Sequence, residues 1–97
     1  MKFSLHPAAE QDVAQALDFY REHAGGPVAQ HFLAEFERVA GLLVRHPELD
    51  TPAARGRRAF PMRLFPYSLV YRVTGSEVRV LVVRHQRRKP GFGGVRR

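Results

Sequence analysis

The C-terminal half of the chain holds the side chains with the greatest capacity for chemistry. They are four cations and one imidazole, on or next to apolar segments: Arg63, Arg72, Arg84, His85 and Arg88. Cleavage of RNA without a metal needs a base for the 2′-hydroxyl, cations that stabilise the charged transition state, and an acid for the leaving oxygen. The imidazole is the group in this set that changes its protonation near neutral pH. The set is therefore a candidate ribonuclease site.

A second set of side chains is suited to holding a nucleic acid or another target. Cations can pair with phosphates and an aromatic ring can stack on a base. The members of this set are Arg57, Arg58, Arg87, Lys89 and Phe92. Two of them have a structural alternative, because positive charges on an edge strand keep sheets from pairing with one another. The role of Arg57 and Arg58 stays open between these two interpretations.

Several other kinds of site are excluded or not indicated. The sequence has no cysteine, which removes disulfide bonds, thiolate metal ligands and a cysteine nucleophile. The remaining histidines lack the spacing of metal ligands; they are His6, His23, His31 and His46. We expect no metal and no cofactor. His85 has a structural alternative as well, a hydrogen bond to a backbone carbonyl at the end of a strand.

Charge is distributed unevenly along the chain. Residues 1–50 carry four Lys/Arg and eight Asp/Glu, a net charge of −4. Residues 51–97 carry twelve Lys/Arg and one Glu, a net charge of +11, and the two halves sum to +7. A field concentrated in one half favours a polyanion or an acidic partner segment, with a merely solvated basic surface as the alternative. No apolar run approaches the roughly 20 residues of a membrane helix, and we expect a cytoplasmic protein without a membrane partner.

Hydrophobic periodicity predicts the elements that position these residues. Residues 8–24 and 27–45 carry apolar side chains on one face at helical spacing. The Gly25-Gly26-Pro27 link between them is too short for anything but an antiparallel helical hairpin. From about residue 52 the period changes to two, which predicts three strands within residues 57–64, 67–73 and 77–84.

The predicted elements form one α+β domain. Residues 2–6 alternate as a short first strand, so the order is β-α-α-β-β-β. Pro61 interrupts the second strand and indicates an edge position or a bulge. We expect the helical hairpin to pack on one face of a small antiparallel sheet. The domain spans residues 1–97, and residues 85–97 form a basic tail without periodicity.

Four segments, in this order, resemble the RelE/ParE superfamily of toxins. They are residues 6–10 (HPAAE), 47–49 (PEL), 65–73 (FPYSLVYRV) and 83–92 (VRHQRRKPGF). The resemblance spans nearly the whole chain and implies a fold of the kind just described. It also implies a growth-inhibiting toxin of a type II toxin–antitoxin system, neutralised by a cognate antitoxin whose disordered C-terminal segment wraps around it.

The superfamily offers two targets, and two residues bear on the choice between them. RelE-like members cut messenger RNA on the ribosome without a metal, whereas ParE-like members poison DNA gyrase. Ser68 stands where RelE-type enzymes usually carry an arginine, and Phe92 is nearest to the place of their terminal tyrosine. Phenylalanine can stack on a base but cannot exchange a proton. These departures, with the segment 85–87 (HQR), favour the ParE-like branch and gyrase.

Two alternatives remain open at the level of the sequence. One is a ribosome-dependent mRNA endoribonuclease. Because this alternative is open, the sequence does not decide whether the chain is an enzyme. The other is a basic module that binds nucleic acid and is not toxic, in which the arginines hold phosphates. Against this module, the sequence has no helix-turn-helix or RNA-binding signature.

Overall fold

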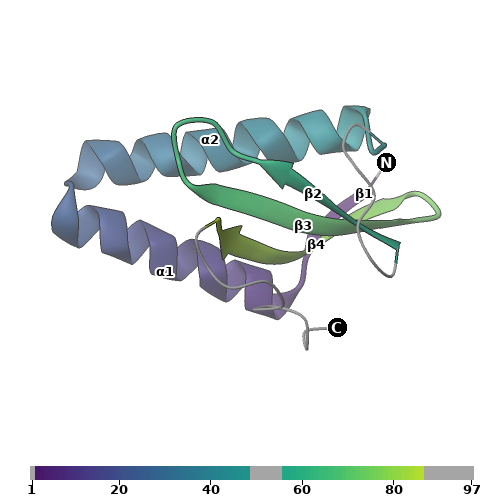
Figure 1. Ribbon diagram of the computed structural model, residues 1–97, viewed down its shortest axis with the longest axis horizontal. Helices are drawn as coiled ribbons and strands as arrows, with labels where there is room; N and C mark the ends of the chain where they lie inside the picture. Colours follow the sequence, from purple (N-terminus) through teal and green to yellow (C-terminus); the bar gives the residue numbers. More distant parts are fainter. Residues whose placement is uncertain (1, 49–55, 87–97) are drawn as a thin grey trace.

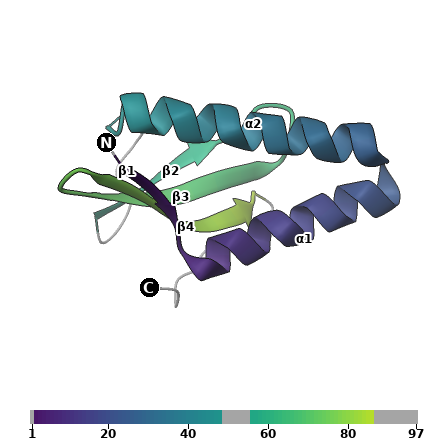
Figure 2. The ribbon, with the colours of Figure 1, turned by 180° about the vertical axis from the view of Figure 1, so that it is seen from behind.

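The computed structural model describes residues 2–48 and 56–86, and two helices cover one face of a four-stranded sheet (Figures 1 and 2). The elements are β1 (Lys2–Leu5), α1 (Pro7–His23), α2 (Gly26–Arg45), β2 (Arg57–Pro61), β3 (Tyr67–Thr74) and β4 (Glu77–His85). This order confirms the predicted α+β fold with its helical hairpin. The predicted tail beyond Gln86 lies outside the described residues. Neither described helix is long and apolar enough to cross a membrane.

Local signals in the sequence explain where the helices begin and end. Pro7 occupies the first turn of α1, where its missing N–H costs nothing, and the His6 ring accepts a hydrogen bond from the Ala8 N–H at 3.0 Å. At the other end, the Gly25 N–H donates to the Tyr20 carbonyl at 2.9 Å. Gly25 has a φ of +96°, a conformation that glycine adopts without strain. The chain therefore reverses here and α2 returns along α1.

The sheet has the strand order β1-β4-β3-β2. The pairs β2–β3 and β3–β4 are antiparallel, as predicted, and Pro61 ends the edge strand β2. The predicted sheet needs one correction, because β1 is parallel to β4, with Lys2 opposite Glu77 and Leu5 opposite Val80. Short turns force antiparallel pairing on β2, β3 and β4. The connection from β1 to β4 contains both helices and two strands, so no turn determines its direction.

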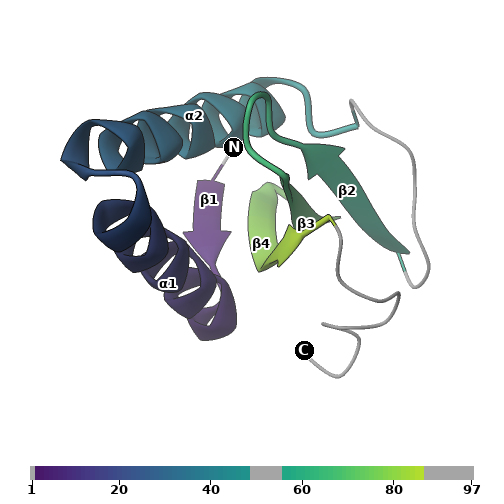
Figure 3. The same ribbon diagram turned by 60° about the vertical axis from the view of Figure 1, so that its left-hand side comes forward.

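The two faces of the sheet carry separate apolar clusters. The face against the helices holds the main core, with fully buried residues from both layers: Phe32, Val39, Leu43, Leu69, Tyr71, Val78 and Val80. The far face holds a smaller cluster of Val70, Leu81 and Val82, flanked by Ala59. Figure 3 shows both helices on one side of the strands. We call the other side the far face.

A bulge in β4 allows the far-face cluster to form. Val70 pairs with Val82 and the next residue, Tyr71, pairs with Val80, so Leu81 is an extra residue in β4. Such a residue breaks the alternation of side chains along a strand. Leu81 and Val82 therefore both join the far-face cluster, and Val83 returns to the helix side.

Asp12 of α1 continues the pairing of β4 where β1 stops. The last β1 residue, Leu5, pairs with Val80, and the His6 N–H donates to the Val80 carbonyl at 2.8 Å. Beyond that point, the Val83 N–H donates to the Asp12 carboxylate at 3.0 Å. A helix side chain thus satisfies a backbone group that a longer β1 would have paired.

Replacing Asp12 with alanine should destabilise the fold. A hydrogen bond to a charged group contributes about 1.5–3 kcal/mol, and we expect Asp12→Ala to lower the free energy of unfolding by that amount in urea denaturation. Asp18→Ala on the same helix is the control. Its ion pair with Arg21 is exposed, and removing it should cost less than about 1 kcal/mol. Equal losses in the two variants would contradict the role of Asp12.

Candidate functional site

The structure separates the two residues at the centre of the predicted ribonuclease site. In β4, Arg84 pairs with Ser68 and His85 pairs with Tyr67. Successive residues of a strand point to opposite faces. Tyr67 packs against the helix-side core, so His85 lies on the helix side and Arg84 on the far face. The two side chains therefore leave β4 on opposite faces of the sheet.

Arg72 shares the far face with Arg84 but lies towards the other end of the sheet. It pairs with Arg57 of β2 and with Arg79 of β4. Arg72 is four positions along β3 from Ser68, the partner of Arg84, which corresponds to about 13 Å along the strand. Arg72 and His85 therefore differ both in face and in position.

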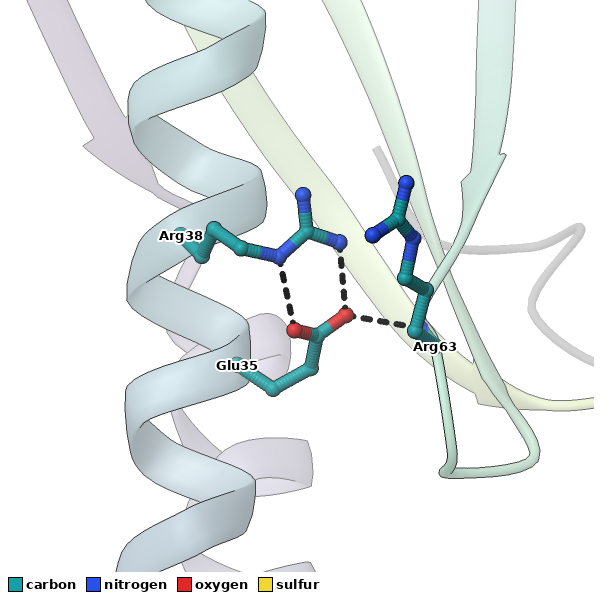
Figure 4. A network of polar contacts seen from close by, with 3 residues as sticks. All are labelled: Glu35, Arg38 and Arg63. Atoms are coloured by element: carbon teal, nitrogen blue, oxygen red, sulfur yellow. Dashed lines mark hydrogen bonds and ion pairs between the residues drawn. The ribbon is translucent and has the colours of Figure 1, made fainter.

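Arg63 belongs to the loop between β2 and β3, and that loop is attached to α2. Its backbone N–H donates to the Glu35 carboxylate at 2.7 Å. Glu35 is only 9% exposed, and Arg38 holds the same carboxylate through two hydrogen bonds of 2.8 and 2.9 Å. Figure 4 shows the side chains of Arg38 and Arg63 on either side of this contact. The backbone at Arg63 is thus tied to α2.

The predicted binding residues fall into two groups. Arg57 and Arg58 are half-buried in β2, and their β3 partners, Arg72 and Tyr71, put Arg57 on the far face and Arg58 on the helix side. The others lie outside the described residues: Arg87, Lys89 and Phe92, together with Arg88 of the first set.

His85 lies among aromatic rings. Its ring meets that of Tyr67 edge to face, with centroids 5.1 Å apart, and Tyr67 in turn contacts Phe32 and Tyr20. Burial raises the pKa of Tyr20, and the neighbouring Tyr67 raises it further. The Tyr20 phenol therefore stays protonated at neutral pH and is no base for a reaction at His85.

The structure does bring three arginines together, and one of them was not among the predicted site residues. Arg57, Arg72 and Arg79 pair in register across β2, β3 and β4 on the far face, and we call them the arginine row. Adjacent strands are about 4.8 Å apart, so the row is about 10 Å long. Arg79 could have been found from the sequence, since a two-residue turn at Gly75-Ser76 pairs it with Arg72.

The surroundings of the arginine row are basic and partly apolar. The Arg79 guanidinium donates to the Ser4 hydroxyl of β1 at 3.1 Å, and all three arginines are half-buried. Glu77 is the only acidic residue in the sequence from 57 to 86. Among residues 2–48 and 56–86, no group of three or more His, Asp or Glu is placed to hold a metal ion.

Comparison with known proteins identifies the class to which this fold belongs. A solved structure described as "Chromosomal ParDE TA system from P. aeruginosa" matches with a TM-score of 0.78 at 22% identity, covering 88% of this chain and 95% of that chain. The two share a fold. Two curated proteins named Toxin ParE2, from Mycobacterium tuberculosis strains CDC 1551 / Oshkosh and ATCC 25618 / H37Rv, are each 24% identical over 89 residues. The match covers 92% of this chain and 85% of theirs.

The fold and these relatives define a small toxin of a toxin–antitoxin system. The family model for the ParE toxin of the type II toxin–antitoxin system parDE matches residues 3–90. The chain belongs to the ParE toxin family. This result confirms the resemblance to the RelE/ParE superfamily and the predicted position in its ParE-like branch.

The Glu35 contact should make the stability of the toxin depend on pH. Hydrogen bonds from Arg38 lower the pKa of Glu35 most, burial opposes them, and the Arg63 N–H lowers it further. The net pKa lies below the value of about 4.3 in the unfolded chain. The stabilisation is therefore fully present above about pH 4.3 and is lost as the pH falls through the folded-state pKa.

Replacing this carboxylate tests the contact directly. We expect Glu35→Gln to lower the free energy of unfolding at pH 7 by about 1.5–3 kcal/mol, because a charge-assisted contact is lost. The difference from wild type should shrink below about pH 4. Glu37→Gln, at an exposed position of the same helix, is the control and should change little. A Glu35→Gln difference that stays constant down to pH 2 would contradict this account.

Proposed function

We propose that this toxin arrests growth by acting on DNA gyrase and not by cutting messenger RNA. The observation that carries the proposal is the dispersal of the candidate catalytic groups. A general base must come within about 3 Å of the proton that it removes, and the stabilising cations must surround the same phosphate. Arg84 and His85 point to opposite faces, and Arg72 lies about 13 Å from the level of Arg84 along β3.

The neighbours of His85 and Arg84 support the same proposal. The residue opposite Arg84 is Ser68, which contributes a hydroxyl where an RNA-cleaving relative would supply a cation. That hydroxyl accepts a hydrogen bond of 3.4 Å from the Gln86 side chain. The ring of His85 contacts the aromatic ring of Tyr67. The family match is to the ParE toxins, and ParE-like members of the superfamily poison gyrase.

Expression without the antitoxin should separate the two targets. We expect DNA breaks trapped with gyrase, both in cells and with purified gyrase and plasmid, and intact messenger RNA on purified ribosomes. His85→Ala and Arg84→Ala should leave the growth arrest largely unchanged. A ribonuclease would lose about 10²- to 10³-fold in rate when one positioned electrostatic donor is removed. Ribosome-dependent mRNA cleavage that disappears in His85→Ala would overturn the proposal.

The proposal includes a cognate antitoxin that binds the basic half of the toxin. The supporting observations are the net charge of +11 over residues 51–97 and apolar side chains that stand in solvent. Among the described residues, Phe19 is 52% exposed and Leu64 is 85% exposed. Leu64 also has a φ of +67°, a backbone conformation that residues other than glycine seldom adopt. An amphipathic, acidic segment could cover such side chains and neutralise the charge.

Salt should weaken the complex with the antitoxin. Exposed ion pairs are screened over about 10 Å at 0.1 M salt and about 3 Å at 1 M, so we expect the dissociation constant to rise roughly tenfold or more between these concentrations. The measurement is a titration by calorimetry or fluorescence with the antitoxin encoded beside the toxin. A dissociation constant that does not change with salt would show that charge does not drive binding.

A further inference from the structure

We propose that the arginine row, Arg57, Arg72 and Arg79, is a binding surface for the sugar–phosphate backbone of duplex DNA. The inference goes beyond the proposed target, because it concerns DNA itself and holds whether or not gyrase is poisoned. It begins from an arrangement that works against the stability of the fold. Like charges directly opposite one another on neighbouring strands are destabilising, and here two such pairs share Arg72.

The chemistry of the row matches phosphate. The segment from residue 57 to 86 contains six arginines and no lysine. The arginine guanidinium is a planar fork that binds phosphate oxygens through two parallel hydrogen bonds, whereas the lysine ammonium acts as a point charge.

The surroundings of the row position the arginines and strengthen their field. Arg79 is fixed from one side by its hydrogen bond to the Ser4 hydroxyl. Beside the row lies the far-face cluster, in which Leu81 and Val82 are each 2% exposed. Charges beside a buried apolar cluster are less screened than charges in open water. The field of the half-buried arginines is therefore weakened less by water when an anion approaches.

The density of charge favours a nucleic acid over an acidic protein segment. On an extended peptide, side chains on one face recur about every 6.6 Å, so a strand lying along the row of about 10 Å offers about two carboxylates. Along one strand of duplex DNA the phosphates recur about every 3.4 Å of the helix axis, or about three times over the same length. Three arginines within this length match one DNA strand more closely.

Equilibrium binding of a short DNA duplex to the purified chain, measured at several salt concentrations, tests the assignment. Each phosphate contact contributes about 0.9 to the slope of log K against log salt concentration. We expect Arg72→Gln and Arg79→Gln each to reduce the slope by about that amount. Arg72→Lys, which keeps the charge without the fork, should retain the slope and bind more weakly. The control is Arg45→Gln, which removes one charge from an exposed position at the end of α2 and should retain the slope.

Thermal unfolding of the same variants separates binding from folding. If the row is kept for a ligand, relieving its repulsion should stabilise the free protein, and we expect Arg72→Gln to melt roughly 2–5 °C higher than wild type. A lower melting temperature for Arg72→Gln would mean that the row serves the fold and would overturn the proposal.

Two further outcomes would also overturn it. One is an equal fall in slope for Arg45→Gln and Arg72→Gln, which would mean that total charge and not the row binds DNA. The other concerns competition for the bound DNA. If a poly-glutamate peptide displaces it as effectively as unlabelled duplex at the same concentration of charge, the row binds an acidic protein segment. Neither outcome decides whether gyrase is the target, so the two proposals fail or hold separately.

Discussion

The pairing register between β3 and β4 is the constraint on which the rest of this structure depends. It sets Tyr67 opposite His85 and Arg72 opposite Arg79, and it passes through the bulge at Leu81. Because strand side chains alternate, a slip of one residue would exchange the two faces of β4. The main core would then lose Val78 and Val80, which are fully buried against the helices. Burial of these valines thus also determines which charged residues share the far face.

The helices are tied to the sheet by a few hydrogen bonds that reach across the layers. Asp12 accepts from the Val83 N–H, Glu35 accepts from the Arg63 N–H, and the Tyr71 hydroxyl donates to the Pro47 carbonyl at 3.1 Å. Each gives a buried or half-buried backbone group a side-chain partner from another layer or segment. They hold α1, the loop after β2 and the end of α2 against one side of the sheet. The described helices therefore leave the far face to other contacts.

That far face combines features that a purely structural sheet would avoid. Neighbouring arginines repel one another across the strands, yet the cluster of Val70, Leu81 and Val82 keeps the same face apolar beside them. A ParE-family toxin has to recognise a neutralising partner as well as its target. Such recognition surfaces commonly retain residues that reduce the stability of the isolated fold. The arginine row fits this pattern, because its like charges stand opposite one another across the strands.

The sequence alone determined the helical hairpin, the three later strands and the toxin family, and it limited Pro61 to an edge position or a bulge. These features rest on local signals, namely the spacing of apolar residues, the Gly-Gly-Pro link and short turns, which act within a few residues of the chain. It did not reveal the direction of β1, because no turn joins β1 to β4. It did not reveal the burial of Glu35, whose partner at Arg63 lies 28 residues away.

The composition of the candidate site was decided only by the tertiary structure. Arg84 and His85 are adjacent in sequence, which suggested that they act together, but alternation along β4 sends them to opposite faces. Arg57, Arg72 and Arg79 are spread over 23 positions of the sequence, yet strand pairing makes them neighbours. Composition determined that the C-terminal half is basic. Register and the bulge decided which of its arginines face the same way, because those depend on pairing between distant segments.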